Sequence, residues 1–143
     1  MNNAQPVLNY YNLSDDVKAF STTRHGGVSE GNYASLNINE YCGDSKANTD
    51  ANRLLLANEL GIDANHIIMP HQTHGVESRI IGEEFATLPD GVKKMLLEGV
   101  DAVMTNIPGM CIGVSTADCI PVLLYDEEHH AAAAIHAGWR GTQ

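Results

Sequence analysis

The feature that most constrains the fold is the C-terminal stretch of residues 101–142, in which apolar runs alternate with short polar segments. Three of these runs, over residues 110–114, 121–125 and 131–135, have about the length of a buried β-strand, and turn-forming or charged residues separate them. The pattern predicts three neighbouring strands of the core. Single polar residues at the ends of these runs are therefore candidates for a functional site.

Potential metal ligands stand at three strand ends. Cys119 lies between the first two runs, His136 ends the third, and His74 follows a strand predicted over residues 66–69. One thiolate and two neutral imidazoles suit zinc, and a three-residue set leaves the fourth tetrahedral position open for water or substrate. Zinc would lower the pKa of a bound water, and Asp118 beside Cys119 is a candidate for proton transfer. The wide spacing of the three ligands matches no compact zinc-finger motif.

The same residues allow three alternatives. Cys119 could act without metal as a nucleophile activated by His74 or His136, as in cysteine hydrolases. A copper-dependent polyphenol oxidase would need a cluster of many imidazoles, and the seven histidines of this chain include no His-X-His pair, so zinc is favoured over copper. In a non-catalytic binding module, Cys111 and Cys119 would simply be buried thiols, which is the simplest explanation for Cys111.

The charge balance argues against some classes of partner. Asp and Glu number 18 against 8 Lys and Arg, which gives a formal net charge of -10, and no basic cluster forms a patch for nucleic acid or an anionic membrane. The first residues do not resemble a leader, and no apolar run approaches the roughly 20 residues that span a bilayer. We therefore expect one soluble, cytoplasmic domain over residues 1–143. Because the three cysteines cannot all pair, at least one thiol is expected to be free.

The N-terminal part predicts a hairpin followed by a loop. Residues 7–13 and 17–21 favour β-strands, and the Ser-Asp-Asp sequence between them favours a turn. Residues 22–38 contain three glycines and several small polar residues, a composition that favours an irregular loop whose backbone can approach a ligand. Arg24 and His25 lie on this loop. Arg24 is a candidate anion ligand, although an ordinary solvated loop explains the sequence at least as well.

Two helices are predicted. The first covers residues 50–60, with Asn48 or Thr49 as its N-cap and Gly61 as its end. The second is a short surface helix over residues 92–98. The residues expected to turn the first helix toward the core are Ala51, Leu54, Leu55 and Leu60.

Four motifs follow one another along nearly the whole chain. They are TTRHGGVSEGNYASLNI, HQTHG, DAVMTNIPG with the downstream STADCIPVLLYD, and AAIHAGWRGT. In this combination the chain resembles the laccase-domain family, also called YfiH-like. That family was long described as multicopper polyphenol oxidases and is now understood as zinc-dependent purine nucleoside phosphorylases with additional adenosine deaminase activity. The resemblance implies an α+β fold with mixed sheets between helical layers, an α/β/β/α sandwich.

The resemblance also implies a site. It maps the metal ligands onto His74, Cys119 and His136, the trio already suggested by residue chemistry. It implies phosphate and purine nucleosides as substrates, among them adenosine, inosine, guanosine and methylthioadenosine. Cys42 and Cys111 match no functional motif. The residues that the resemblance places near substrate or phosphate are Arg24, Asn37, His71 and Arg140.

The chain departs from the family at its end. Family members are usually longer, whereas this chain stops two residues after Gly141, and Thr142 resembles the N-cap of a helix that would follow. We therefore expect a C-terminally truncated domain whose uncovered apolar strand faces favour self-association.

Overall fold

The computed structural model describes residues 5–116 and 120–138. Five residues named above, Asp118, Cys119, Arg140, Gly141 and Thr142, lie outside the described residues. The chain divides into two compact units, Met1–Ala64 and Asn65–Gln143, and each is described by itself. No helix in the described part of the chain is long and apolar enough to cross a membrane.

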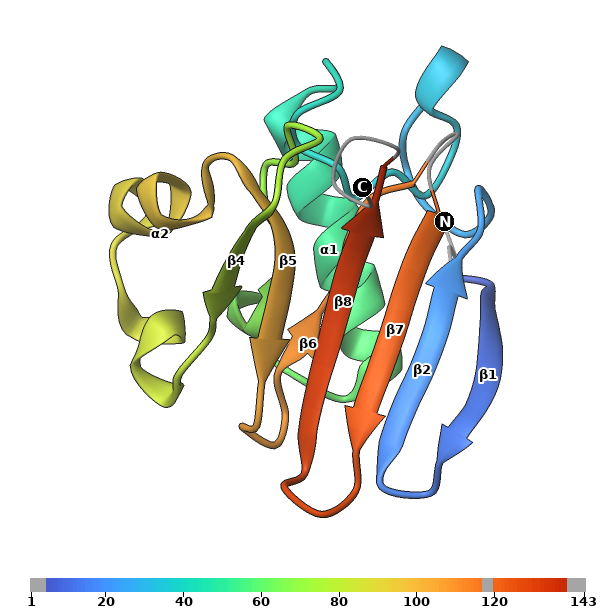
Figure 1. Ribbon diagram of the computed structural model, residues 1–143. Coiled ribbons are helices and arrows are strands. Elements are labelled where there is room, and N and C mark those ends of the chain that lie inside the picture. Colours follow the sequence, from blue (N-terminus) through green and yellow to red (C-terminus); the bar gives the residue numbers. More distant parts are fainter. Residues whose placement is uncertain (1–4, 117–119, 139–143) are drawn as a thin grey trace. The chain divides into compact units, whose positions relative to one another are not determined.

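The described residues of the first unit form a β-hairpin, a long loop and an α-helix (Figure 1). β1 (Leu8–Ser14) pairs antiparallel with β2 (Val17–Thr22), so the predicted hairpin is confirmed. The loop predicted over residues 22–38 is also irregular and contains only a short 3-10 turn, η1 (Gly31–Tyr33). The helix α1 (Lys46–Leu60) follows this loop.

Two glycines of the loop allow close contacts within the protein. A side-chain carbon at Gly26 would overlap the backbone of Gln5, and one at Gly27 would overlap the backbone of Ser35 and Leu36. Gly26 also has a φ of 98°, a conformation that residues with side chains rarely adopt. These two glycines therefore let the loop pack against its own chain, whereas the sequence suggested that they let a ligand approach.

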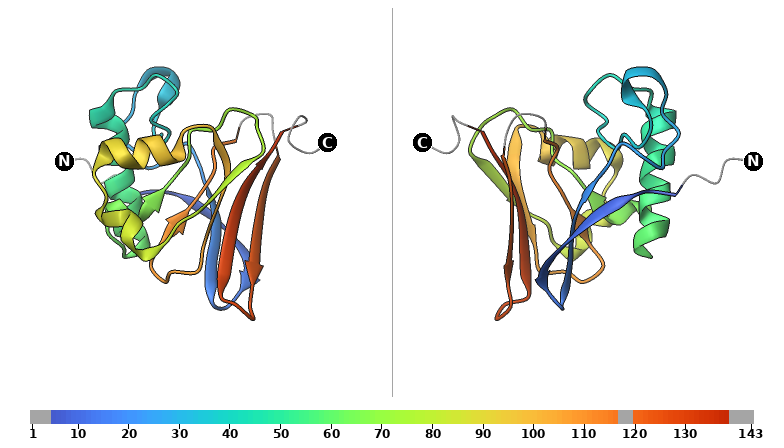
Figure 2. Two further views of the ribbon diagram at one scale, coloured as in Figure 1. Left: turned by 60° about the vertical axis from the view of Figure 1, so that its left-hand side comes forward. Right: turned by 90° about the vertical axis from the view of Figure 1, so that its right-hand side faces the viewer.

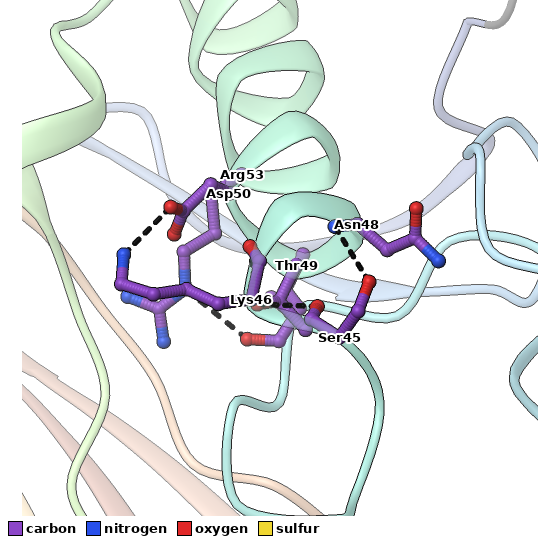
Figure 3. A network of polar contacts seen from close by, with 7 residues as sticks. Ser45, Lys46, Asn48, Thr49, Asp50 and Arg53 are labelled. Carbon is purple, nitrogen blue, oxygen red and sulfur yellow. Dashed lines mark hydrogen bonds and ion pairs between the residues drawn. The ribbon is translucent and has the colours of Figure 1, made fainter.

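α1 begins earlier than predicted. Its N-cap is Ser45, whose hydroxyl accepts a hydrogen bond from the backbone N–H of Asn48 at 3.2 Å (Figure 3). Asn48 and Thr49, the predicted caps, lie inside the first turn because the serine before them already satisfies a free backbone donor. Gly61 ends the helix as predicted, in the left-handed conformation with φ of 72°.

The buried face of α1 differs from the predicted one. Leu54 is 53% exposed, and Ala51, Leu55 and Leu60 are only partly buried. The buried face carries two polar residues. The hydroxyl of Thr49 donates to backbone carbonyls at the start of the helix, whereas Asn52 bonds to backbone groups of the loop that packs on it. The buried residues of α1 are Thr49, Asn52, Leu56 and Ala57.

The second unit is built on a four-stranded sheet with the order β4-β5-β8-β7 (Figures 1 and 2). β4 and β5 run parallel, whereas β8 is antiparallel to both β5 and β7. This mixed sheet, together with the helices, confirms the predicted α+β class. The strands are β4 (Glu77–Ile80), β5 (Val100–Thr105), β7 (Ile120–Asp126) and β8 (Ala131–Ala137).

The apolar run at residues 110–114 does not join this sheet, contrary to the prediction. Only β6 (Cys111–Ile112) forms a strand there, and it pairs parallel with β3 (Ile67–Ile68). The pairing is short because the backbone N–H and C=O of Ser115 bond to the side chain of Gln72 rather than to a neighbouring strand. A side-chain partner 43 residues away in the sequence thus ends the strand that apolarity predicted.

The core of the second unit includes residues from the segment predicted to lie on the surface. A 3-10 turn, η3 (Glu83–Thr87), supplies the buried Phe85, and α2 (Asp90–Leu97) supplies the buried Leu97. The turn η2 (Ala64–His66) leads into β3. The core residues are Ile68, Ile81, Phe85, Leu97, Val100, Val103 and Ala134.

β7 is buried on one side only, although its apolar run predicted a fully buried strand. Leu123 packs against the core, whereas Ile120 is 67% exposed and Leu124 is 54% exposed. Successive side chains of a strand point to opposite faces, so β7 has one core-facing and one outward apolar face. Self-association through such a face stays a prediction.

Candidate active site

Two paired strands bring a carboxylate and an imidazole together in the interior of the second unit. Asp101 belongs to β5 and His136 to β8. Both are buried: Asp101 exposes 2% of its surface to solvent and His136 exposes 6%. The Nδ1 atom of His136 lies 2.8 Å from the Oδ2 atom of Asp101. His136 was predicted from the sequence as a site residue, whereas Asp101 was not.

Asp101 also holds the turn that carries His74. Its Oδ1 accepts a hydrogen bond from the backbone N–H of Thr73 at 3.1 Å, and its Oδ2 accepts one from the backbone N–H of His74 at 3.0 Å. His74 has a φ of 63°, which is uncommon for a residue with a side chain. The buried carboxylate therefore stabilises an unfavourable backbone conformation and fixes both predicted imidazole ligands.

The hydrogen bonds to Asp101 decide its charge. Burial alone would raise the pKa of Asp101, but the hydrogen bonds from His136, Thr73 and Gly75 outweigh burial and hold that pKa below its ordinary value of 3.8. An ionised carboxylate can only accept hydrogen bonds, so the proton in the contact with His136 must reside on Nδ1. In the neutral imidazole, Nε2 then carries the lone pair that a metal ion would need.

The rings of His74 and His136 lie close together, with centroids 5.0 Å apart and planes inclined by 63°. Two imidazoles bound to one tetrahedral zinc at about 2.0–2.1 Å would have centroids roughly 5 Å apart. Edge-to-face packing of two rings also permits this separation, so the distance alone does not select a metal. The carboxylate on Nδ1 of His136 is the more specific feature, because histidine ligands of metals usually donate their other nitrogen to such a group.

The third predicted ligand cannot be placed beside these two rings. Cys119 lies outside the described residues, as does Asp118, and among the residues that are described no three His, Cys, Asp or Glu side chains form a metal-binding group. Ile120, the chain neighbour of Cys119, pairs in the sheet with Ala137, the residue after His136. Cys119 as a ligand therefore stays a prediction.

Gln72 joins the turn that carries His74 to the segment that follows β6. Its Nε2 donates to the carbonyl oxygen of Ser115 at 2.7 Å, and its Oε1 accepts from the N–H of the same residue at 2.6 Å. This two-point contact follows the end of the β3–β6 pairing, where the Gly113 N–H donates to the Ile68 carbonyl at 3.1 Å. Sequence reasoning did not single out Gln72, although it stands between the two histidines of the HQTH motif.

His71 lies against the chain segment that leads into β5. Its Nδ1 is 2.7 Å from the Oε2 of Glu98. The His71 N–H donates to the Leu97 carbonyl, and the Gly99 N–H donates to the His71 carbonyl, both at 3.0 Å. The segments around residues 71–74 and 98–101 are thus tied together at His71 and again at Asp101. A role for His71 in substrate binding stays a prediction.

The other predicted substrate residues that are described, Arg24 and Asn37, belong to the loop of the first unit. Arg24 is exposed, and its carbonyl oxygen accepts hydrogen bonds from the N–H groups of Ser35 and Leu36 at 2.6 and 3.0 Å. The side-chain amide of Asn37 donates to Asp44 at 3.2 Å and to the Cys42 sulfur at 3.3 Å. Arg24 thus presents a cation at the surface of the unit, whereas Asn37 is engaged within its own loop. Arg140 lies outside the described residues.

Asp44 should make the stability of this loop depend on pH. The hydrogen bond from the Ser29 hydroxyl, at 2.5 Å, is the main cause that lowers the pKa of Asp44 below 3.8. A carboxyl whose pKa is lowered by folding stabilises the folded state above its unfolded pKa, and this contribution is lost as pH falls through the folded pKa. Denaturant unfolding between about pH 5 and pH 2 should therefore show a steeper loss of stability in the native chain than in Asp44→Asn. Equal slopes would contradict the assignment.

The four motifs noted in the sequence also agree with an established family. A family described as "Multi-copper polyphenol oxidoreductase laccase" matches residues 18–143. The chain belongs to this laccase family. The resemblance inferred from the motifs is thereby confirmed, and the description of the family points to a metal-dependent group without deciding which metal this chain binds.

Relatives within the laccase family carry enzyme names. A purine nucleoside phosphorylase of Bacteroides thetaiotaomicron is 44% identical over 138 residues, which cover 95% of this chain and 51% of that protein. An adenosine deaminase, RL5, from an unknown prokaryotic organism is 41% identical over 135 residues, which cover 94% of this chain and 52% of that protein. This chain therefore spans about half the length of these relatives.

Solved structures agree with the fold. YfiH of Bacillus licheniformis, a hypothetical protein, aligns with a TM-score of 0.76 at 29% identity, over 87% of this chain and 47% of that one. YlmD of Geobacillus stearothermophilus aligns with a TM-score of 0.73 at 31% identity, over 85% of this chain and 45% of that one. The arrangement of strands and helices described here is thus that of the laccase family.

Proposed function

We propose that this protein is a zinc-dependent enzyme that cleaves purine nucleosides with phosphate. The observation that carries the proposal is the buried Asp101–His136 pair beside His74, because it prepares two imidazoles as metal ligands at the positions that the motifs predict. The name of the Bacteroides relative, purine nucleoside phosphorylase, supports the reaction class. Adenosine, inosine, guanosine and methylthioadenosine are the substrates that we propose.

The residues of the chain would prepare the site as follows. His74, Cys119 and His136 would hold the zinc. Asp101 keeps the proton of neutral His136 on Nδ1, which leaves the lone pair of Nε2 available to a metal ion. When bound, zinc supplies a Lewis acid that polarises an oxygen atom in its open coordination position. The backbone N–H groups of Thr73 and His74 add two donors that keep Asp101 ionised.

The reaction needs an anion site as well as the metal. In phosphorolysis an oxygen of phosphate forms a bond to C1′ of the ribose, the bond from C1′ to the base breaks, and its electron pair leaves with the base, which takes up a proton. The products are ribose 1-phosphate and the free base. Arg24, which is exposed and positively charged, and Arg140 are proposed to bind phosphate through charge-assisted hydrogen bonds. Asn37 and His71 are proposed to contact the nucleoside.

A chromatographic assay with and without phosphate tests this function. We expect adenosine or inosine to yield free base and ribose 1-phosphate only when phosphate is present, with the Bacteroides relative assayed in parallel as a positive control. Release of ammonia from adenosine without phosphate would instead favour deamination, the second candidate, which the name of the 41% identical relative supports. If neither product forms while the control is active, the proposal fails.

Three further alternatives give different results in the same preparation. A metal-free cysteine hydrolase that uses Cys119 would remain active in a chelator. A polyphenol oxidase would oxidise a phenolic dye only after loading with copper. A non-catalytic binding module would bind a nucleoside without converting it. Each outcome would replace the proposed function by a different one.

A further inference from the structure

A buried side chain of α1 makes three hydrogen bonds to the loop of the first unit. Asn52, in the middle of α1, is 0% exposed. Its Oδ1 accepts a hydrogen bond from the Val28 N–H at 2.8 Å, and its Nδ2 donates to the Ser29 hydroxyl at 2.9 Å and to the Asn37 carbonyl at 2.8 Å. The Asn52 amide therefore supplies hydrogen-bond partners to two segments of the loop, one at residues 28–29 and one at residue 37.

The loop is organised around this amide. Ser29 links Asn52 to Asp44 in a chain of hydrogen bonds. The Ser29 hydroxyl donates to Asp44 at 2.5 Å, and Asp44 also accepts a hydrogen bond from the Asn37 side chain at 3.2 Å. A side-chain carbon at Gly27 would overlap the Asn52 amide oxygen, so the glycine allows the loop to approach the helix. Asn52, Ser29 and Asp44 thus set the conformation of residues 24–38.

Only an amide of this size meets these demands. An aspartate would keep the acceptor for Val28 but would lose both donors, and it would bring a second carboxylate toward the Ser29–Asp44 contact. A leucine would leave the backbone groups of Val28 and Asn37 buried without their hydrogen-bond partners. The presence of a buried asparagine on a helix that could carry leucine is therefore explained by the loop and not by the helix.

We propose that Asn52 is a positioning residue for anion binding, acting through the loop so that the guanidinium of Arg24 is held where phosphate binds. The proposal rests on the proposed function, which assigns phosphate to Arg24. The backbone of Arg24 is held within the same loop, because its carbonyl oxygen accepts hydrogen bonds from the N–H groups of Ser35 and Leu36. These hydrogen bonds lie within the first unit and none of them involves His74 or His136, so the Michaelis constant for phosphate should change rather than the rate of the chemical step.

The test compares Asn52→Asp with Asn58→Asp, a matched control at an exposed position of the same helix. We expect KM for phosphate to rise roughly tenfold in Asn52→Asp while kcat changes less than about twofold, and both constants to stay unchanged in Asn58→Asp. Ser29→Ala removes one partner of Asn52 and keeps the other two, so a smaller rise in KM should follow even if Asn52→Asp does not fold. A loss of kcat in proportion to the folded fraction, with KM unchanged, would show that Asn52 has a structural role only.

Direct binding separates this inference from the proposed function. Inorganic phosphate is titrated into the native chain and each variant, and the amide signals of the loop are followed by NMR. If the native chain does not cleave nucleosides but binds phosphate more tightly than Asn52→Asp does, the proposed function fails and the positioning role stands. If the native chain cleaves nucleosides and Ser29→Ala and Asn52→Asp bind phosphate with unchanged affinity, the positioning role is wrong. If phosphate does not bind to the native chain, the inference is also wrong.

Discussion

Replacing Asp101 with Asn is expected to weaken zinc binding by about 10–100-fold, the usual effect of removing the carboxylate behind a histidine ligand. The amide has one acceptor oxygen in place of two, so at least one of its donors, on His136, Thr73 or His74, would be left buried without a partner. The free energy of unfolding should therefore fall by about 3 kcal/mol. Isothermal titration with zinc and denaturant unfolding measure the two effects separately.

Asp126→Asn provides the matched control. Asp126 also accepts a hydrogen bond from a histidine, at 2.7 Å from Nδ1 of His129, and from the backbone N–H groups of Glu128 and His129. Unlike Asp101, it lies at an exposed turn, where water replaces a lost partner. We expect little change in zinc affinity or stability. If the Asp101 and Asp126 variants behave alike, Asp101 does not position a metal ligand.

Cys119→Ser is expected to abolish turnover of purine nucleosides, with a loss of at least about a thousandfold in kcat/KM, because a hydroxyl is a much poorer zinc ligand than a thiolate. The same loss would follow if Cys119 were a metal-free nucleophile. Chelation distinguishes the two cases. The zinc account predicts that a chelator removes the activity of the native chain and that zinc restores it.

Alkylation of the thiols completes that experiment. A metal-free nucleophile would remain active in the chelator and would be inactivated by a thiol reagent whether or not zinc is present. A zinc-bound thiolate should be protected from the reagent by zinc and should react once the metal is removed. The chain has three cysteines, so Cys42→Ala/Cys111→Ala is the background in which Cys119 is followed as the one remaining thiol. Activity that survives chelation would contradict the zinc account.

The sequence predicted His136 as a site residue because it ends an apolar run, and that local pattern survives in β8. It did not predict Asp101 as the partner of His136, because the contact depends on the pairing of β5 with β8, which are far apart in the chain. A signal was present. A charged residue within the apolar run of β5 is costly to bury unless it is paired, and Asp101 could have been selected on that ground.

Hydrophobic pattern was also a poor guide to the face of α1. The leucines suggested a core side around Leu54, but Leu54 is exposed, and the buried residues of α1 include the polar Asn52. The apolar pattern shows which helix positions can be buried against other apolar groups. It does not show that the loop packed on α1 presents backbone groups that Asn52 must bond. The glycines of the loop were recognised as unusual, yet only the fold shows that they serve contacts within the protein.

Short strands were also difficult to predict from the sequence. The hairpin of β1 and β2 was predicted because its turn is local and its strands adjoin. β6 was predicted too long and in the wrong sheet, since the Gln72 side chain, which takes both backbone groups of Ser115, has no signature in the local pattern. The length and the pairing of β6 thus depend on partners distant in the sequence, which local preferences do not reveal.

The most direct test of the account is the metal content of the purified chain, measured by elemental analysis without added metal and again after loading with zinc. The account predicts about one zinc per chain in the native protein, and much less in His136→Ala and Cys119→Ser under the same conditions. A native chain that carries no zinc and takes up none on loading would contradict it. Copper in place of zinc would return the protein to the oxidase alternative.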